Sequence, residues 1–122
     1  MVDVQHGKIC YIVMPSRDVE RSGTFYRDVF SWTLRTDGKG GASFDDSTGQ
    51  VSGTWVSDRP AASSGNLEVH IMVDDLLRTI DAIRDAGGSV DETDIHVESE
   101  RWAVFTDPDG NRLGIYQQAG GS

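Results

Sequence analysis

Cysteine is nearly absent from this sequence, since Cys10 is the only one among 122 residues. A single thiol excludes a framework of intramolecular disulfides, and its position within an apolar run, residues 9–14, predicts a reduced and buried side chain. The chain is 37% hydrophobic, which is enough to bury a core without a disulfide or a structural metal. We therefore expect a single domain, residues 1–122, in a reducing compartment, the cytoplasm.

Long apolar runs and basic residues are also scarce. No segment approaches the length of a transmembrane helix, and the first residues lack the charged leader and apolar stretch of a signal peptide. Eleven Lys and Arg face 20 Asp and Glu, so the formal net charge is -9. This field repels phosphate backbones and anionic lipids, so we expect neither nucleic acid nor membrane as a partner. It would favour a cationic small ligand, although an acidic surface can also serve solubility alone.

The sequence contains an internal repeat. Asp18 falls on Asp75 when the chain is shifted by 57 positions, and the same shift aligns residues 18–22, 26–28 and 36–37 with residues 75–79, 83–85 and 93–94. Two copies are too few for a solenoid. The repeat therefore predicts a duplicated module folded about a pseudo-two-fold axis.

Each copy predicts a strand, then a helix, then further strands. Asp18 can cap the first helix, and Asp74 or Asp75 the second, which Gly87 and Gly88 would end. The expected strands are residues 9–14, 32–36, 42–44 and 50–56 in the first copy, and residues 67–73, 89–92, 101–106 and 112–117 in the second. Residues 107–110 predict a tight turn before the last strand. We place module one at about residues 8–56, a linker at residues 57–65 and module two at about residues 66–118.

Three segments carry a resemblance to a known family: residues 15–22 with Phe25 and Tyr26, residues 73–76, and the stretch Phe-Thr-Asp-Pro-Asp-Gly-Asn at residues 105–111. Together they resemble the vicinal oxygen chelate superfamily, which includes glyoxalase I, extradiol dioxygenases and bleomycin resistance proteins. The resemblance implies an α+β fold of two βαβββ modules, forming a cupped mixed sheet with helices on the convex side. It implies little about the reaction, because this fold carries many chemistries and some pure binding roles.

The resemblance also gives four places for metal ligands. Metal-dependent members carry a His or Glu on the first and last strand of each module, and the corresponding residues here are Tyr11, Gly53, Glu68 and Gly114. Only Glu68 is an ordinary ligand for a catalytic divalent ion, and such sites normally need about three protein ligands. We therefore expect no metal and no cofactor, with the glycines leaving room for a ligand. His70 could add a second donor.

Strand alternation supplies the other candidate site residues. Glu68, His70 and Met72 share one face of their strand, and the repeat places Tyr11 and Val13 on the equivalent face. Trp55, Tyr116 and, at the rim, Trp102 would add aromatic walls, which suit a flat or cationic ligand. Aromatic residues in strands also form plain cores or dimer contacts. His6 and His96 are interpreted as surface residues.

Two functions remain open. The first is metal-free binding of a cationic or aromatic small molecule, as in the bleomycin resistance branch, by a homodimer. The second is an enzyme of glyoxalase-like or dioxygenase-like type, in which Glu68 and His70 perform acid-base catalysis or bind a metal. A third role, chiefly in association with another subunit, is also compatible with the sequence.

Overall fold

The computed structural model describes residues 6–7, 9–36, 41–63 and 67–117. The chain divides into two compact units, residues 1–61 and residues 62–122. None of the described helices has the length and apolar character needed to cross a membrane.

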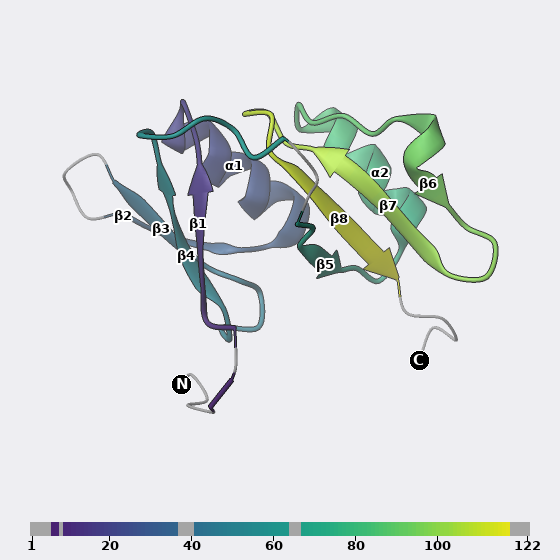
Figure 1. The fold of residues 1–122 in the computed structure, drawn as a ribbon, viewed down its shortest axis with the longest axis horizontal. Helices are drawn as coiled ribbons and strands as arrows, with labels where there is room; N and C mark the ends of the chain where they lie inside the picture. The colour runs from purple at the N-terminus through teal and green to yellow at the C-terminus, as the bar shows by residue number, and fades with distance from the viewer. Residues whose placement is uncertain (1–5, 8, 37–40, 64–66, 118–122) are drawn as a thin grey trace. The chain divides into compact units, whose positions relative to one another are not determined.

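Unit one is a four-stranded mixed sheet with one helix (Figure 1). Its elements are β1 (Tyr11–Pro15), α1 (Val19–Phe30), β2 (Thr33–Thr36), β3 (Ala42–Asp45) and β4 (Ser52–Val56). The strand order is β1-β4-β3-β2, in which β1 and β4 run parallel and the other pairs antiparallel. As expected, Asp18 caps α1, because its side chain accepts a hydrogen bond from the backbone N–H of Arg21.

Aromatic rings fill the space between α1 and its sheet. The ring of Tyr26 stacks on Trp32 and that of Trp32 on Phe44, each at a centroid separation of 4.6 Å. Trp55 completes the row at 4.8 Å from Phe44. All four side chains are buried, so the apolar face of this sheet is the one that packs against the helix.

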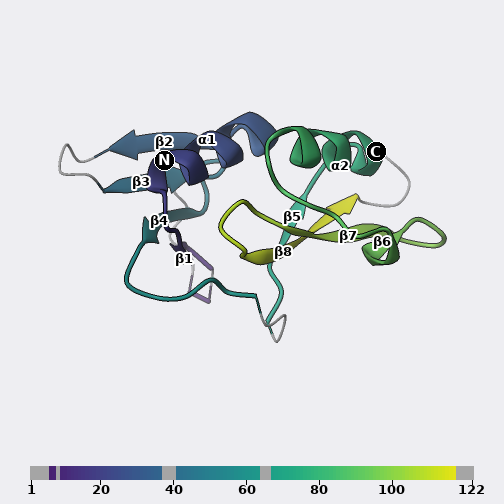
Figure 2. The same cartoon turned by 90° about the horizontal axis from the view of Figure 1, so that it is seen from above.

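Unit two repeats the arrangement. Its elements are β5 (His70–Met72), α2 (Leu76–Asp85), the 3-10 helix η1 (Glu92–Asp94), β6 (Ile95–His96), β7 (Arg101–Thr106) and β8 (Arg112–Gln117). The strand order is β5-β8-β7-β6, again with only the first pair parallel. Figure 2 shows α2 on one side of β7 and β8. The α+β class and the two βαβββ modules are thus confirmed.

The turn before the last strand has the same construction in both units. Asp46 and Asp107 each accept backbone hydrogen bonds through Oδ1, and Gly49 and Gly110 each donate to the backbone oxygen of that aspartate at 3.0 Å. Both glycines adopt a positive φ, 75° and 93°, which an L side chain adopts only with strain. The two turns differ in length, however. Asp45 pairs with Ser52 in unit one, whereas Thr106 pairs with Arg112 in unit two, so the first turn contains one more residue.

Two local expectations are wrong. Cys10 is exposed rather than buried, because it precedes β1 instead of lying within it. Residues 89–92 do not form a strand; Ser89 makes a single bridge to Thr106, and the strand at this edge is β6, after η1. Residues 91–94 instead form a short turn in which Asp91 accepts hydrogen bonds from the backbone N–H and the hydroxyl of Thr93.

Candidate functional site

Alternation along the strands of unit two separates two faces. Buried apolar residues mark the face toward α2, namely Ala103 and Phe105 on β7 and Leu113 and Ile115 on β8. Their neighbours along each strand point to the opposite side, which we call the helix-free face. Its rows are set by strand pairing: His70, Gly114 and Val104 form one row, and Met72, Tyr116, Trp102 and His96 form the next.

His70 and Glu68 meet on this face, as the sequence predicted. Nε2 of His70 lies 3.1 Å from Oε1 of Glu68, and about a third of each side chain is exposed. The imidazole lies over Gly114, where an added Cβ would come within 2.4 Å of His70 Cε1. The glycine therefore does not leave an empty space, because the ring of His70 fills it.

Trp102 lies between two imidazoles. Its ring centroid is 4.0 Å from that of His96, with 14° between the ring planes, and 6.0 Å from that of His70. Tyr116 is its cross-strand neighbour on β8, and both rings are partly exposed. Three of the predicted residues, His70, Trp102 and Tyr116, thus share one aromatic face, and Met72 lies beside them with 63% of its surface exposed.

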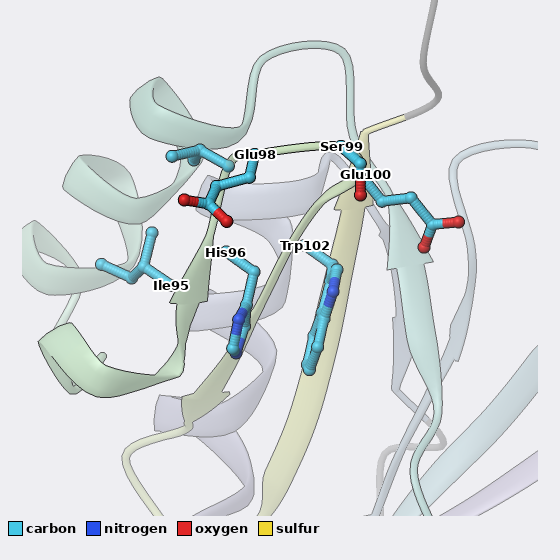
Figure 3. Close-up of a pocket in the computed structure, with 7 residues that line it drawn as sticks. Ile95, His96, Glu98, Ser99, Glu100 and Trp102 are labelled. Atoms are coloured by element: carbon cyan, nitrogen blue, oxygen red, sulfur yellow. The ribbon is translucent and has the colours of Figure 1, made fainter.

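A hollow of about 380 Å³ opens at the edge of this face. It is lined by Ile95, His96, Val97, Glu98, Ser99, Glu100 and Trp102. Figure 3 shows the rings of His96 and Trp102 side by side with parallel planes. The sequence interpretation missed His96, because a two-residue strand in an acidic stretch gives no periodic signal.

Two predicted residues lie on the wrong face of unit one. Trp55 belongs to the buried aromatic row, 3% exposed, and within the described chain its Nε1 has no hydrogen-bond partner. A Cβ on Gly53 would point into the same core, 2.2 Å from Phe44. The extra residue in the unit-one turn explains the error: Val13 pairs with Thr54 as His70 pairs with Gly114, so the counterpart of Gly114 is Thr54. A shift of one residue reverses every side chain in a strand.

The corresponding face of unit one, which lies on the side of its sheet away from α1, carries several polar side chains. Tyr11 and Val13 do lie on it, 52% and 43% exposed, next to Ser52 and Thr54 of β4. Asp45 holds an ion pair with Arg35 at 3.1 Å and accepts a hydrogen bond from Ser52 at 2.6 Å. The hydrogen bond from Ser52 and the nearby guanidinium hold the pKa of Asp45 below its ordinary value, against the opposing effect of burial.

The donors on these faces do not fit the divalent metal of the superfamily. Glu68 and His70 supply two donors, whereas Gly114 and Val104 occupy the rest of their row. Across the described residues, no three His, Cys, Asp or Glu side chains gather in a group that could hold a metal ion. At the corresponding places in unit one, Tyr11 offers a phenol and Thr54, the counterpart of Gly114, a hydroxyl.

Comparison with known proteins identifies the family. The model of the glyoxalase/bleomycin resistance protein/dioxygenase superfamily matches residues 8–115. A glyoxylase-like domain-containing protein from Didymella fabae is 31% identical over 132 residues, which covers 96% of this chain and 98% of the relative.

Solved structures share the fold at low sequence identity. TnmS3, an antibiotic binding protein from Streptomyces sp. CB03234, superimposes with a TM-score of 0.71 at 23% identity, covering 96% of this chain and 100% of its own. The fosfomycin resistance protein FosX from Listeria monocytogenes gives a TM-score of 0.76 at 12% identity, over 95% of this chain and 94% of its own. The chain therefore belongs to the glyoxalase/bleomycin resistance protein/dioxygenase superfamily, of vicinal oxygen chelate fold.

Proposed function

We propose that this protein binds a small organic molecule with a planar part on the helix-free face of unit two, without a metal ion. The observation that carries the proposal is the row of rings on that face. Trp102 offers an indole flanked by His96 at 4.0 Å and His70 at 6.0 Å, and Tyr116 lies on the adjoining strand. Rings of this kind bind planar ligands by stacking and by burial of apolar surface.

Two relatives support a small molecule as the ligand. TnmS3 is described as an antibiotic binding protein and FosX as a fosfomycin resistance protein. Both descriptions concern low-molecular-weight compounds, so a ligand of that size is the class we extend to this chain.

A second function is favoured by one contact. His70 and Glu68 are 3.1 Å apart, the arrangement in which a carboxylate orients an imidazole for proton transfer. If a bound molecule carries an acidic C–H or a leaving group near Nδ1 of His70, this pair would serve as its base or acid. A small molecule that the wild-type protein converts, but that neither His70→Gln nor Glu68→Gln converts, would support this catalytic function.

The metal-free part of the proposal is tested by metal analysis. Protein purified without chelator and without a nickel column should contain no stoichiometric metal. Added manganese, iron, nickel or zinc should leave its unfolding temperature unchanged. One tightly bound ion per chain, lost in Glu68→Ala or His70→Ala, would contradict this reading and make a lyase, isomerase or dioxygenase the leading candidate.

The binding part is tested with indole as a neutral planar probe, followed by backbone amide NMR shifts. Shifts should concentrate at His70, Trp102 and Tyr116, and Trp102→Leu should weaken binding about fivefold, since a stacked ring pair contributes about 1 kcal/mol beyond its buried area. Leu77→Ala is the control, because it removes an apolar side chain that is 52% exposed on α2 instead. Equal weakening in both variants would argue against a specific site.

Homodimer formation and a cytoplasmic location complete the proposal. Tyr11 and Val13 on β1 and Met72 on β5 leave apolar surface exposed, which a second copy could cover. Sedimentation equilibrium at micromolar concentration distinguishes a dimer from a monomer. For the location, the single free thiol of Cys10 is compatible with a reducing compartment.

A further inference from the structure

The hollow at the β6–β7 hairpin contains charged side chains that are not needed to bind a neutral planar ligand. Glu98 and Glu100 line it, and His96 is the only basic side chain among its seven lining residues. Figure 3 shows Glu98 on the side of His96 and Glu100 on the side of Trp102. Two carboxylates and an indole face favour a positive group at this position, through Coulomb attraction and through the quadrupole of the ring.

His96 can supply such a positive group itself. With a centroid separation of 4.0 Å and 14° between planes, the neutral imidazole stacks on Trp102 as an aromatic ring. When protonated, it interacts with the same indole as a cation and lies among the same carboxylates. A second cation in the hollow would then be repelled by His96 and would gain less from Glu98 and Glu100.

We propose that this hollow binds the positive end of a monovalent organic cation with a planar part, and that protonation of His96 weakens that binding. The inference rests on the proposed function, because the planar part would lie on the aromatic face described above. Linkage makes the effect reciprocal: a bound cation disfavours protonation of His96 by the same factor by which protonation weakens the cation.

Other charged groups surround His96. Glu98 and Glu100 belong to the hairpin loop, and Asp94 precedes β6 and pairs with Arg112 of β8 at 3.6 Å. On the far side of Trp102 lies His70 with its partner Glu68. Among these groups, the two histidines carry imidazole, the side-chain type that switches charge near neutral pH. The test must therefore separate His96 from His70.

The test uses benzyltrimethylammonium as the cation and benzyl alcohol as its neutral counterpart. Quenching of Trp102 fluorescence reports binding, because the other two tryptophans, Trp32 and Trp55, are 5% and 3% exposed. The cation should bind about tenfold more weakly at about pH 5.5 than at about pH 8, whereas benzyl alcohol should bind equally at both. His96→Phe keeps a ring on Trp102 but should abolish the pH dependence. His70→Gln should keep it, whatever its effect on affinity.

The carboxylates are tested by a matched pair of double variants. Glu98→Gln/Glu100→Gln removes two negative charges from the hollow and should abolish the preference for the cation over the alcohol. Asp81→Asn/Asp85→Asn removes two exposed negative charges from α2 and so changes the net charge by the same amount. It should keep the preference for the cation, because salt screens charges far from the hollow.

The outcomes separate the role of His96, the cation site and the binding of planar ligands. An unchanged pH dependence in His96→Phe would overturn the role of His96. Equal binding of both probes at about pH 8, with amide shifts at Trp102 and Tyr116, would overturn the cation site and leave the proposed function standing. No shift on the helix-free face with either probe would overturn both.

Discussion

Gly114 is the residue that determines where His70 lies. Its hydrogen occupies the place where a Cβ would be 2.4 Å from Cε1 and 2.5 Å from Nδ1 of His70. The imidazole can therefore lie directly over β8, within reach of Glu68 and of Trp102. The place that the family resemblance assigns to a metal ligand here accommodates a neighbouring ring.

Gly114→Ala should displace the imidazole of His70. We expect the free energy of unfolding to fall by about 1–3 kcal/mol, the usual cost of overpacking, and the contact with Glu68 to be lost. Urea unfolding measures the first effect, and NMR chemical shifts of the His70 imidazole measure the second.

A double-mutant cycle provides the control. His70→Ala vacates the space over Gly114, so adding Gly114→Ala to it should cost much less than Gly114→Ala alone. Equal costs in the two backgrounds would mean that the strain arises elsewhere on β8, and that Gly114 does not position His70.

At the scale of elements, the sequence predicted the strands with strong periodic patterns and missed the short one. Residues 101–106 and 112–117 are β7 and β8 as expected, because alternating apolar residues and the turn between them define both ends. Two-residue β6 has no pattern of its own, and its partner β7 determines where it pairs. His96 could not be assigned to the site for that reason.

The error at Gly53 and Trp55 has a different origin. Both units share the aspartate and the glycine of the turn, so an alignment through these residues is correct within the turn itself. The extra residue follows the glycine, and the pairing of Asp45 with Ser52 absorbs it. Turn chemistry is local and readable, whereas register depends on the partner strand, which no single segment encodes.

The unit-two turn also holds the start of its own unit. Asn111 is 1% exposed; its Oδ1 accepts from the backbone N–H of Ala62 at 2.8 Å and its Nδ2 donates to Asp107 at 3.0 Å. The backbone N–H of Arg112 donates to the oxygen of Ala62 as well. These hydrogen bonds attach Ala62, at the start of unit two, to the turn before β8.

Asn111→Ala should lower the free energy of unfolding by about 2 kcal/mol, because it leaves a buried carboxylate oxygen of Asp107 without this donor. Gln50→Ala is the matched control: Gln50 holds the same position in unit one but is only half-buried, and its backbone N–H, which alanine retains, donates to Asp46 as that of Asn111 does to Asp107. Urea unfolding should give a loss of about 1 kcal/mol or less for the control. Similar losses would mean that the side chain of Asn111 contributes no more than bulk.

At the scale of the whole molecule, the net charge of -9 sets the response to salt. Some acidic side chains are paired, as Asp45 is with Arg35, but these pairs are exposed and contribute little to stability. The remaining carboxylates repel one another in the compact state more than in the unfolded chain, and salt screens that repulsion.

Raising the NaCl concentration from about 10 mM to about 150 mM should therefore increase the unfolding temperature by a few degrees, since the screening length falls from about 30 Å to about 8 Å. Calorimetry at neutral pH measures the change. The Asp81→Asn/Asp85→Asn variant should show a smaller increase, because it begins with two fewer negative charges. A decrease in the unfolding temperature with salt would mean that attractive pairs such as Arg35 and Asp45 outweigh the general repulsion. In that case the acidic surface would be organised by specific ion pairs, and its long-range attraction for a cationic ligand would be correspondingly weaker.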